Sequence, residues 1–164
     1  MRILFLKSSS PISKLIMWAT REDCSHMAFL FESGLKGLMF ESNLLGTHPC
    51  FYQTEIKNHT VVHDITMMMG ETLEDSVWDI IINQYDGKGY NYLGAIYLGW
   101  RKWLKTRFNI ALPKQNKWSQ PGAFFCDQVY DVLNKIPGMK QINVMNGMDT
   151  PHDVYLNLKD NQNG

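Results

Sequence analysis

The chain has 164 residues, of which 45% are hydrophobic and 12% aromatic, and its formal net charge at pH 7 is zero. This length suits one domain with its own core, and this composition excludes a disordered chain. A net charge of zero provides no overall attraction to nucleic acid, so we expect no nucleic-acid partner. No apolar run reaches the length of a membrane span, and the run at 3–6 is too short for a secretory signal. We therefore expect a cytoplasmic protein at synthesis.

Apolar patterning predicts an early helix, then a block of strands, then further helices. A strand is predicted at 2–6, and a helix that Pro11 opens is predicted at 11–20. Further strands are predicted at 25–32, 38–42, 51–56 and 60–65. Helical spacing of apolar residues predicts helices at 71–83, 93–108 and 124–136, and a short helical turn at 150–156. This segregation favours the α+β class, as a single domain at 1–159 followed by a frayed tail at 160–164.

Two features of the predicted strands bear on function. Alternation within 25–32 places His26, Ala28 and Leu30 on one face, and Met27, Phe29 and Phe31 on the other. Two other histidines, His59 and His63, lie four residues apart in or beside the predicted strand at 60–65. We expect these two to be solvated or packed histidines, not metal ligands.

Cys126 is the strongest candidate for a reactive group, because it lies at the predicted start of the helix at 124–136. Unpaired backbone N–H groups and the helix dipole both favour the thiolate there. A thiolate needs a base, and His26 heads a strand whose other residues are apolar. Glu41, on the next predicted strand, could fix the imidazole tautomer. The structural alternative is a buried cysteine, an ordinary sheet histidine and a surface glutamate.

Five short sequence motifs follow one another along the chain, in the order SHMAFLFE, LMFES, GKGYNYLG, FFCDQVYDVL and TPHDVYL. The order resembles that of the circularly permuted NlpC-type superfamily of papain-like cysteine hydrolases, nearest its YiiX-like branch, over about residues 26–156. The resemblance implies a permuted papain-like fold, in which an antiparallel sheet packs against helices and the nucleophile lies at a helix N-terminus. It also implies an amidase or peptidase that attacks a peptide or other acyl-bearing substrate through a thioester, without a metal or other cofactor.

The resemblance also implies residue roles. Cys126 matches the nucleophile, His26 the base and Glu41 the acidic third member of a triad. Tyr90 matches a tyrosine that lines the site, and its implied role is to hold the acyl oxyanion beside the backbone N–H of Cys126. The chain departs from the family at Asp127, where serine is usual. A carboxylate beside the nucleophile opposes thiolate formation, so this departure leaves the substrate class open.

Three alternatives remain open at the level of sequence. Cys24, His26, His48 and Cys50 could form the tetrahedral zinc site of a structural protein, although their one-residue spacings are tighter than usual. The same fold could serve as a catalytically inactive binding module. It could also act on a lipid or an ester, as an acyltransferase or thioesterase does.

The predicted helix at 93–108 bears on the lipid alternative. It carries apolar residues on one face, Leu93, Ile96, Trp100, Trp103 and Leu104, with its basic residues mostly elsewhere. This pattern is typical of a core helix with one solvated face, and it also suits a helix that contacts a membrane surface.

Overall fold

The computed structural model describes residues 1–34, 37–43, 45–113, 122–124 and 150–162. Its elements, in chain order, are β1 (Arg2–Ser8), α1 (Pro11–Thr20), β2 (His26–Leu30), β3 (Leu38–Asn43), β4 (Gly46–Phe51), α2 (Tyr52–Glu55), η1 (Ile56–Asn58), β5 (His59–Thr66), α3 (Glu71–Tyr85), β6 (Gly89–Tyr90), α4 (Tyr92–Phe108), β7 (Ala123–Phe124) and α5 (Pro151–Gln162). The α+β class is therefore confirmed. The predicted helix at 124–136 lies outside the described residues except at Phe124, which belongs to β7.

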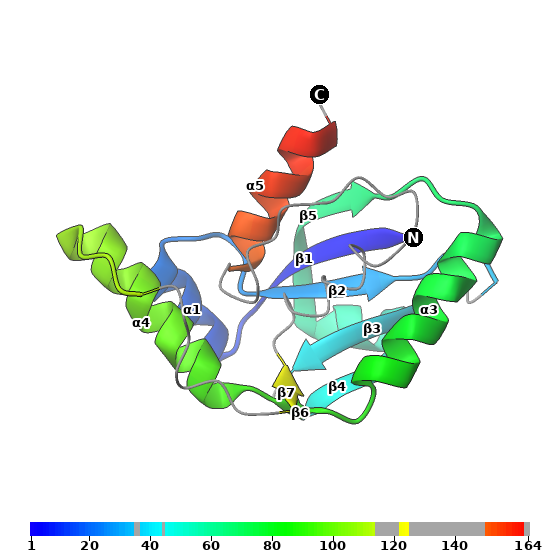
Figure 1. Ribbon diagram of the computed structural model, residues 1–164, viewed down its shortest axis with the longest axis horizontal. Helices are drawn as coiled ribbons and strands as arrows, with labels where there is room; N and C mark the ends of the chain where they lie inside the picture. Colours follow the sequence, from blue (N-terminus) through cyan, green and yellow to red (C-terminus); the bar gives the residue numbers. More distant parts are fainter. Residues whose placement is uncertain (35–36, 44, 114–121, 125–149, 163–164) are drawn as a thin grey trace.

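The main sheet has five antiparallel strands in the order β4-β3-β2-β1-β5 (Figure 1). β1 lies between β2 and β5, and four successive side chains, Ile3, Leu4, Phe5 and Leu6, are fully buried. A continuous apolar run of this kind fits a strand that is covered on both faces. Both faces of the sheet therefore contribute to the core.

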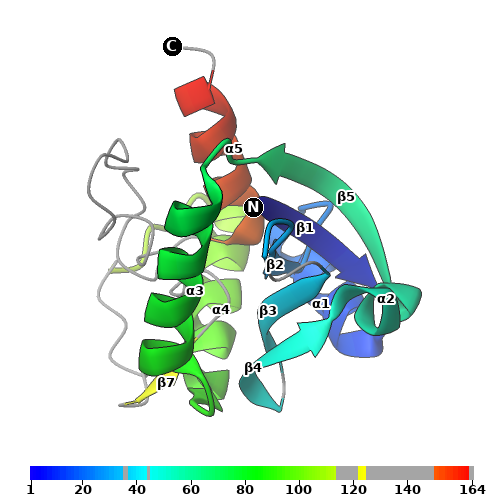
Figure 2. The same ribbon diagram turned by 90° about the vertical axis from the view of Figure 1, so that its right-hand side faces the viewer.

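The predicted alternation along β2 is confirmed. Met27 and Phe29 belong to a core cluster that includes Val77 and Ile81 of α3 and Val154 and Leu158 of α5. Figure 2 shows α3 and α5 on one side of the sheet. Ala28 and Leu30 belong to a second cluster, against which Tyr52 and Ile56 pack. His26 shares the face of this second cluster, so it lies on the side of the sheet opposite α3 and α5.

The predicted strand at 51–56 is wrong beyond Phe51, the last residue of β4, because the rest of the segment forms α2 and the start of η1. β4 and β5 lie at opposite edges of the sheet, so the chain must cross one face between them, and a continued strand cannot do this. Tyr52 and Ile56, four residues apart, lie on one side of the helical turn and pack against the second core cluster. At the other end of the chain, α5 continues to Gln162, well past the short turn predicted at 150–156 and into the predicted tail.

The apolar face predicted for the helix at 93–108 is only partly covered by the described residues. Gly94 is the one buried residue of α4, which lies against α1 (Figure 1), while Ile96 and Trp100 are 57% and 55% exposed. Among the described residues, no helix is long and apolar enough to cross a membrane. Several apolar residues of α4, among them Leu93, Ile96 and Trp100, thus lie at the surface of the described structure, whereas Trp103 and Leu104 are half-buried.

Candidate active site

The structure brings His26 and Glu41 together. Ala28 of β2 pairs with Glu41 of β3, and His26 precedes Ala28 by two residues, so both functional side chains lie on one face as diagonal neighbours. His26 Nε2 lies 2.9 Å from Glu41 Oε2. Glu41 is only 2% exposed, which identifies it as a buried carboxylate and excludes the surface glutamate of the structural alternative.

Polar neighbours compensate for the burial of Glu41. Asn43 Nδ2 donates to Glu41 Oε1 over 2.6 Å, and His48, directly opposite on β4, places its Nε2 3.6 Å from the same oxygen. Burial alone would raise the pKa of Glu41, but the hydrogen bond and charge of His26, with Asn43 and His48, hold it below its ordinary value. Glu41 is therefore an ionised hydrogen-bond acceptor at neutral pH.

An ionised Glu41 fixes the tautomer of His26. A carboxylate only accepts hydrogen bonds, so the His26 nitrogen beside it, Nε2, must carry a proton. In the neutral imidazole the lone pair then resides on Nδ1. If His26 acts as a base, it acts through Nδ1, and Glu41 stabilises the imidazolium that results.

His26 lies at a pocket of about 390 Å³. Hydroxyl groups dominate its polar lining, which comes from Ser8, Ser10, Ser13, Ser25, Ser42, Asn43, His59 and Tyr90. Ile12 and Ile16 of α1, with Leu45, form the apolar part. The ring centroid of His59 lies 5.8 Å from that of His26. A pocket with an apolar wall and convergent polar groups is the usual form of a small-molecule or peptide site.

Tyr90 also lines this pocket. It belongs to β6, and the segment before it is tied to β4 because Thr47 N donates to Lys88 O over 2.9 Å. Gly46, at φ +114°, allows this approach, since a Cβ there would lie 2.5 Å from Lys88 O. β6 pairs in parallel with β7, with Tyr90 opposite Phe124.

Cys126 and Asp127 lie outside the described residues. β7 ends at Phe124, two residues before Cys126 in the sequence. The sequence gives no reason to place Asn43, His48 or His59 beside His26 and Glu41, although His48 is a candidate zinc ligand there and His59 a solvated or packed histidine. The sequence does not predict the strand that carries His48, although a hairpin register extended from Glu41 would place His48 opposite it.

The other two cysteines are poor nucleophiles. Cys24 is buried in the cluster with Phe29, and burial, with the charges of Glu41 and Glu55, raises the pKa of Cys50 to about 12. Among the described residues, two groups of side chains hold metal-ligand atoms within 4.8 Å of one another. Cys24 belongs to neither, so the four-residue zinc site considered from the sequence is not assembled.

Comparisons with models of protein families, with curated proteins and with solved structures give no match.

Proposed function

We propose that the protein is a thiol hydrolase of the permuted papain-like type, in which Cys126 is the nucleophile, His26 the base and Glu41 the orienting acid. The observation that carries the proposal is the contact of 2.9 Å between the buried Glu41 and the partly exposed His26, beside a pocket that Tyr90 also lines. A buried carboxylate that orients an imidazole at a pocket wall is the arrangement that general-base catalysis requires.

The proposed reaction begins when His26 Nδ1 accepts the proton of the Cys126 thiol. The sulfur bonds to the carbonyl carbon of an amide or peptide, and the π electrons of the C=O bond move to its oxygen. The imidazolium donates its proton to the leaving amine as the C–N bond breaks, which leaves a thioester. Water then attacks the thioester carbon while His26 Nδ1 takes a proton of the water. The C–S bond breaks, the proton passes to the departing sulfur, and the products are a carboxylic acid and the free Cys126 thiol.

The hydroxyl of Tyr90 is the proposed side-chain donor to the oxyanion, together with the backbone N–H of Cys126. The pairing of Tyr90 with Phe124 supports this role, because the described chain reaches the Tyr90 side of the pocket two residues before Cys126. Asp127 opposes thiolate formation, so the imidazolium of His26 must outweigh that carboxylate.

Labelling with iodoacetamide at mildly acidic pH tests the proposal. A thiol of ordinary pKa near 8.5 is only about 0.1% thiolate at pH 5.5, whereas a histidine-paired thiolate reacts readily. We expect labelling of the wild type that Cys126→Ala abolishes and His26→Asn slows by about 100-fold or more. Cys50→Ser, the matched control, should label like the wild type.

Two outcomes would contradict the assignment. Labelling that persists in Cys126→Ala would assign the reactive thiol to Cys24 or Cys50. A Cys126 thiol that reacts no faster in the wild type than in His26→Asn would favour the inactive binding module.

A second candidate function, hydrolysis or transfer of an ester-linked or lipid acyl group, is favoured by the exposed apolar residues of α4. Leu93, Ile96 and Trp100 are each about half exposed, and basic side chains follow on the same helix. Exposed apolar and basic residues on one helix suit an anionic membrane surface. Through this helix, the protein would meet a substrate that resides in a membrane.

Flotation with vesicles that contain anionic lipid tests this candidate. The wild type should float, and the Ile96→Ser/Trp100→Ser variant should remain in the dense fraction. Met68→Ser is the control, since Met68 is an apolar residue that is 99% exposed outside α4. A wild type that does not float would reject a membrane contact through α4. An Ile96→Ser/Trp100→Ser variant that floats as well as the wild type would reject it too.

A further inference from the structure

Three side chains outside the proposed active site converge at the start of α5. Asp23 follows α1, His63 belongs to β5 and His152 lies in the first turn of α5. His63 Nε2 is 2.8 Å from Asp23 Oδ2, and His152 Nδ1 is 3.0 Å from Asp23 Oδ1. One carboxylate thus joins two imidazoles that are 89 positions apart in the sequence (152 − 63).

A β-bulge separates this cluster from the proposed active site. Phe5 pairs with His63, but Leu6 pairs with Val61, so β5 contains one extra residue at this point. In a regular strand His59 and His63 would share a face. Because of the bulge, His59 faces His26, while His63 faces α5 together with Phe5.

The ring of His63 is held in place by aromatic neighbours. Tyr155 of α5 stacks on it, with ring centroids 3.8 Å apart and an angle of 7° between the planes. Phe5 meets it edge-on, at 6.5 Å. Aromatic packing on two sides fixes the direction of Nε2, which is the kind of support that metal-ligating histidines require.

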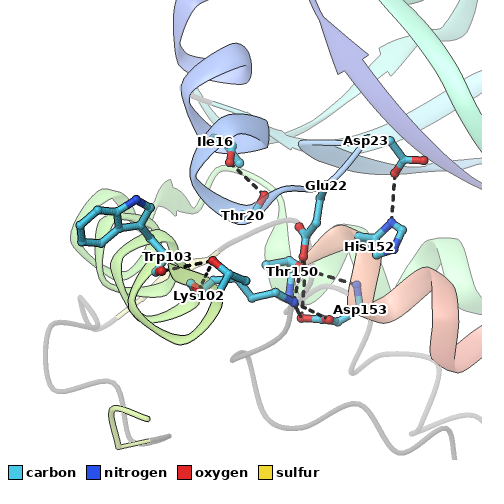
Figure 3. Close-up of polar contacts among 10 residues, drawn as sticks. Ile16, Thr20, Glu22, Asp23, Lys102, Trp103, Thr150, His152 and Asp153 are labelled. Carbon is cyan, nitrogen blue, oxygen red and sulfur yellow. Dashed lines mark hydrogen bonds and ion pairs between the residues drawn. The ribbon is translucent and has the colours of Figure 1, made fainter. Parts of the chain in front are cut away.

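A second set of contacts fixes the two segments that carry Asp23 and His152. Their sequence neighbours, Glu22 and Asp153, both bind Lys102 of α4, at 2.9 and 2.7 Å (Figure 3). Figure 3 shows His152 beside this network and directed at Asp23. The positions of Asp23 and His152 therefore do not depend on their own hydrogen bond alone.

The chemistry of the cluster suits a metal ion. Two imidazole nitrogens and one carboxylate are a ligand set for zinc and related divalent transition metals, whereas magnesium and calcium prefer oxygen ligands. The three ligand atoms lie within 4.8 Å of one another, and ligands of a tetrahedral zinc ion are about 3.3 Å apart. Asp23 is half exposed and both histidines are partly exposed, so small side-chain shifts suffice and water can complete the coordination.

We propose that Asp23, His63 and His152 form a binding site for a divalent transition-metal ion, for which Zn²⁺ is the best fit, and that the bound ion fastens α5 to the sheet. His63 would bind through Nε2 and His152 through Nδ1. This role differs from the solvated or packed histidine expected at His63 from the sequence. The site does not depend on the proposed hydrolase reaction, because the ion would lie on the opposite face of the sheet from His26.

Zinc titration of chelator-treated protein, followed by calorimetry and by the unfolding temperature, tests the site. We expect one Zn²⁺ per chain and a higher unfolding temperature with zinc, while Mg²⁺ has no effect. His152→Asn and Asp23→Asn should each weaken zinc binding by more than about 100-fold, because even substitutions behind a ligand cost 10–100-fold. Circular dichroism of both variants without metal verifies that they fold.

The competing cluster of Glu41, His48 and Cys50 provides the control. Cys50→Ser should leave the affinity for zinc unchanged, and the Co²⁺-loaded protein should lack a sulfur-to-cobalt charge-transfer band. Zinc binding that is lost in Cys50→Ser, or that is unchanged in His152→Asn and Asp23→Asn, would overturn the proposal. Binding no tighter than millimolar in the wild type would also overturn it.

Discussion

Replacement of Glu41 by Gln removes the negative charge beside His26 and keeps the shape of the side chain. A hydrogen bond to a charged group contributes about 1.5–3 kcal/mol, and the neutral amide retains part of it. The amide nitrogen of Gln would also face the Asn43 amide, which now donates to Glu41 over 2.6 Å. Because position 41 is buried, solvent screens little of this loss. We therefore expect Glu41→Gln to lower the free energy of unfolding by about 2 kcal/mol at pH 7.

The pH dependence of this effect has a definite sign. The pKa of Glu41 in the folded protein lies below its ordinary value of 4.5, so folding favours the carboxylate. The stability that follows is fully present above pH 4.5 and is lost as the pH falls through the depressed pKa. Since Gln does not titrate, the difference between variant and wild type should shrink below pH 4.5.

Urea unfolding at several pH values measures both effects. With a slope of about 2 kcal/mol per molar urea, the midpoint of Glu41→Gln should fall by about 1 M at pH 7. Glu55→Gln is the matched control, because Glu55 also faces a histidine, at 3.9 Å, but is partly exposed, and it should cost less than about 1 kcal/mol. A Glu41→Gln variant as stable as the wild type, or a difference that grows in acid, would refute the reasoning.

Two further substitutions test the scaffold. Lys102→Met removes the cation between the carboxylates of Glu22 and Asp153, and we expect the free energy of unfolding, measured with urea, to fall by about 2–4 kcal/mol. The control Lys105→Met, on the exposed side of α4, should change it by less than about 0.5 kcal/mol. Equal effects of the two substitutions would contradict the stabilising role of this ion-pair network. Gly46→Ala forces a Cβ against Lys88 O, so it should lower the unfolding temperature more than Gly87→Ala does. Gly87 also has a positive φ, but the space around its Cβ position is open. The reverse order of unfolding temperatures would contradict the close approach of Gly46 to Lys88.

Much of the site could be predicted from the sequence because it depends on short-range patterns. The alternation of β2 places His26 on one face, and the hairpin that follows brings Glu41 opposite Ala28. Family resemblance alone proposes Tyr90 as a site residue, and Tyr90 lines the pocket beside His26. The patterns that succeeded involve neighbouring strands, where a period of two and a short connection determine which side chains meet.

The features that could not be predicted depend on interruptions of those patterns. The extra residue in β5 reverses the orientation of His63 relative to His59, and no turn residue in the sequence marks it. His152 joins the cluster only because α5 packs on the sheet, a contact between opposite ends of the chain. The prediction of a strand at 51–56 fails because a run this short shows no clear period, and without one a strand and a helix cannot be told apart.

A crystal structure that resolves the side chains of Cys126 and His26 is the decisive test of the proposed catalytic pair. We expect a distance of about 3–4 Å between Cys126 Sγ and His26 Nδ1, with Nε2 still bound to Glu41. A distance beyond about 7 Å, with no mobile element between the two residues, would contradict the proposed mechanism.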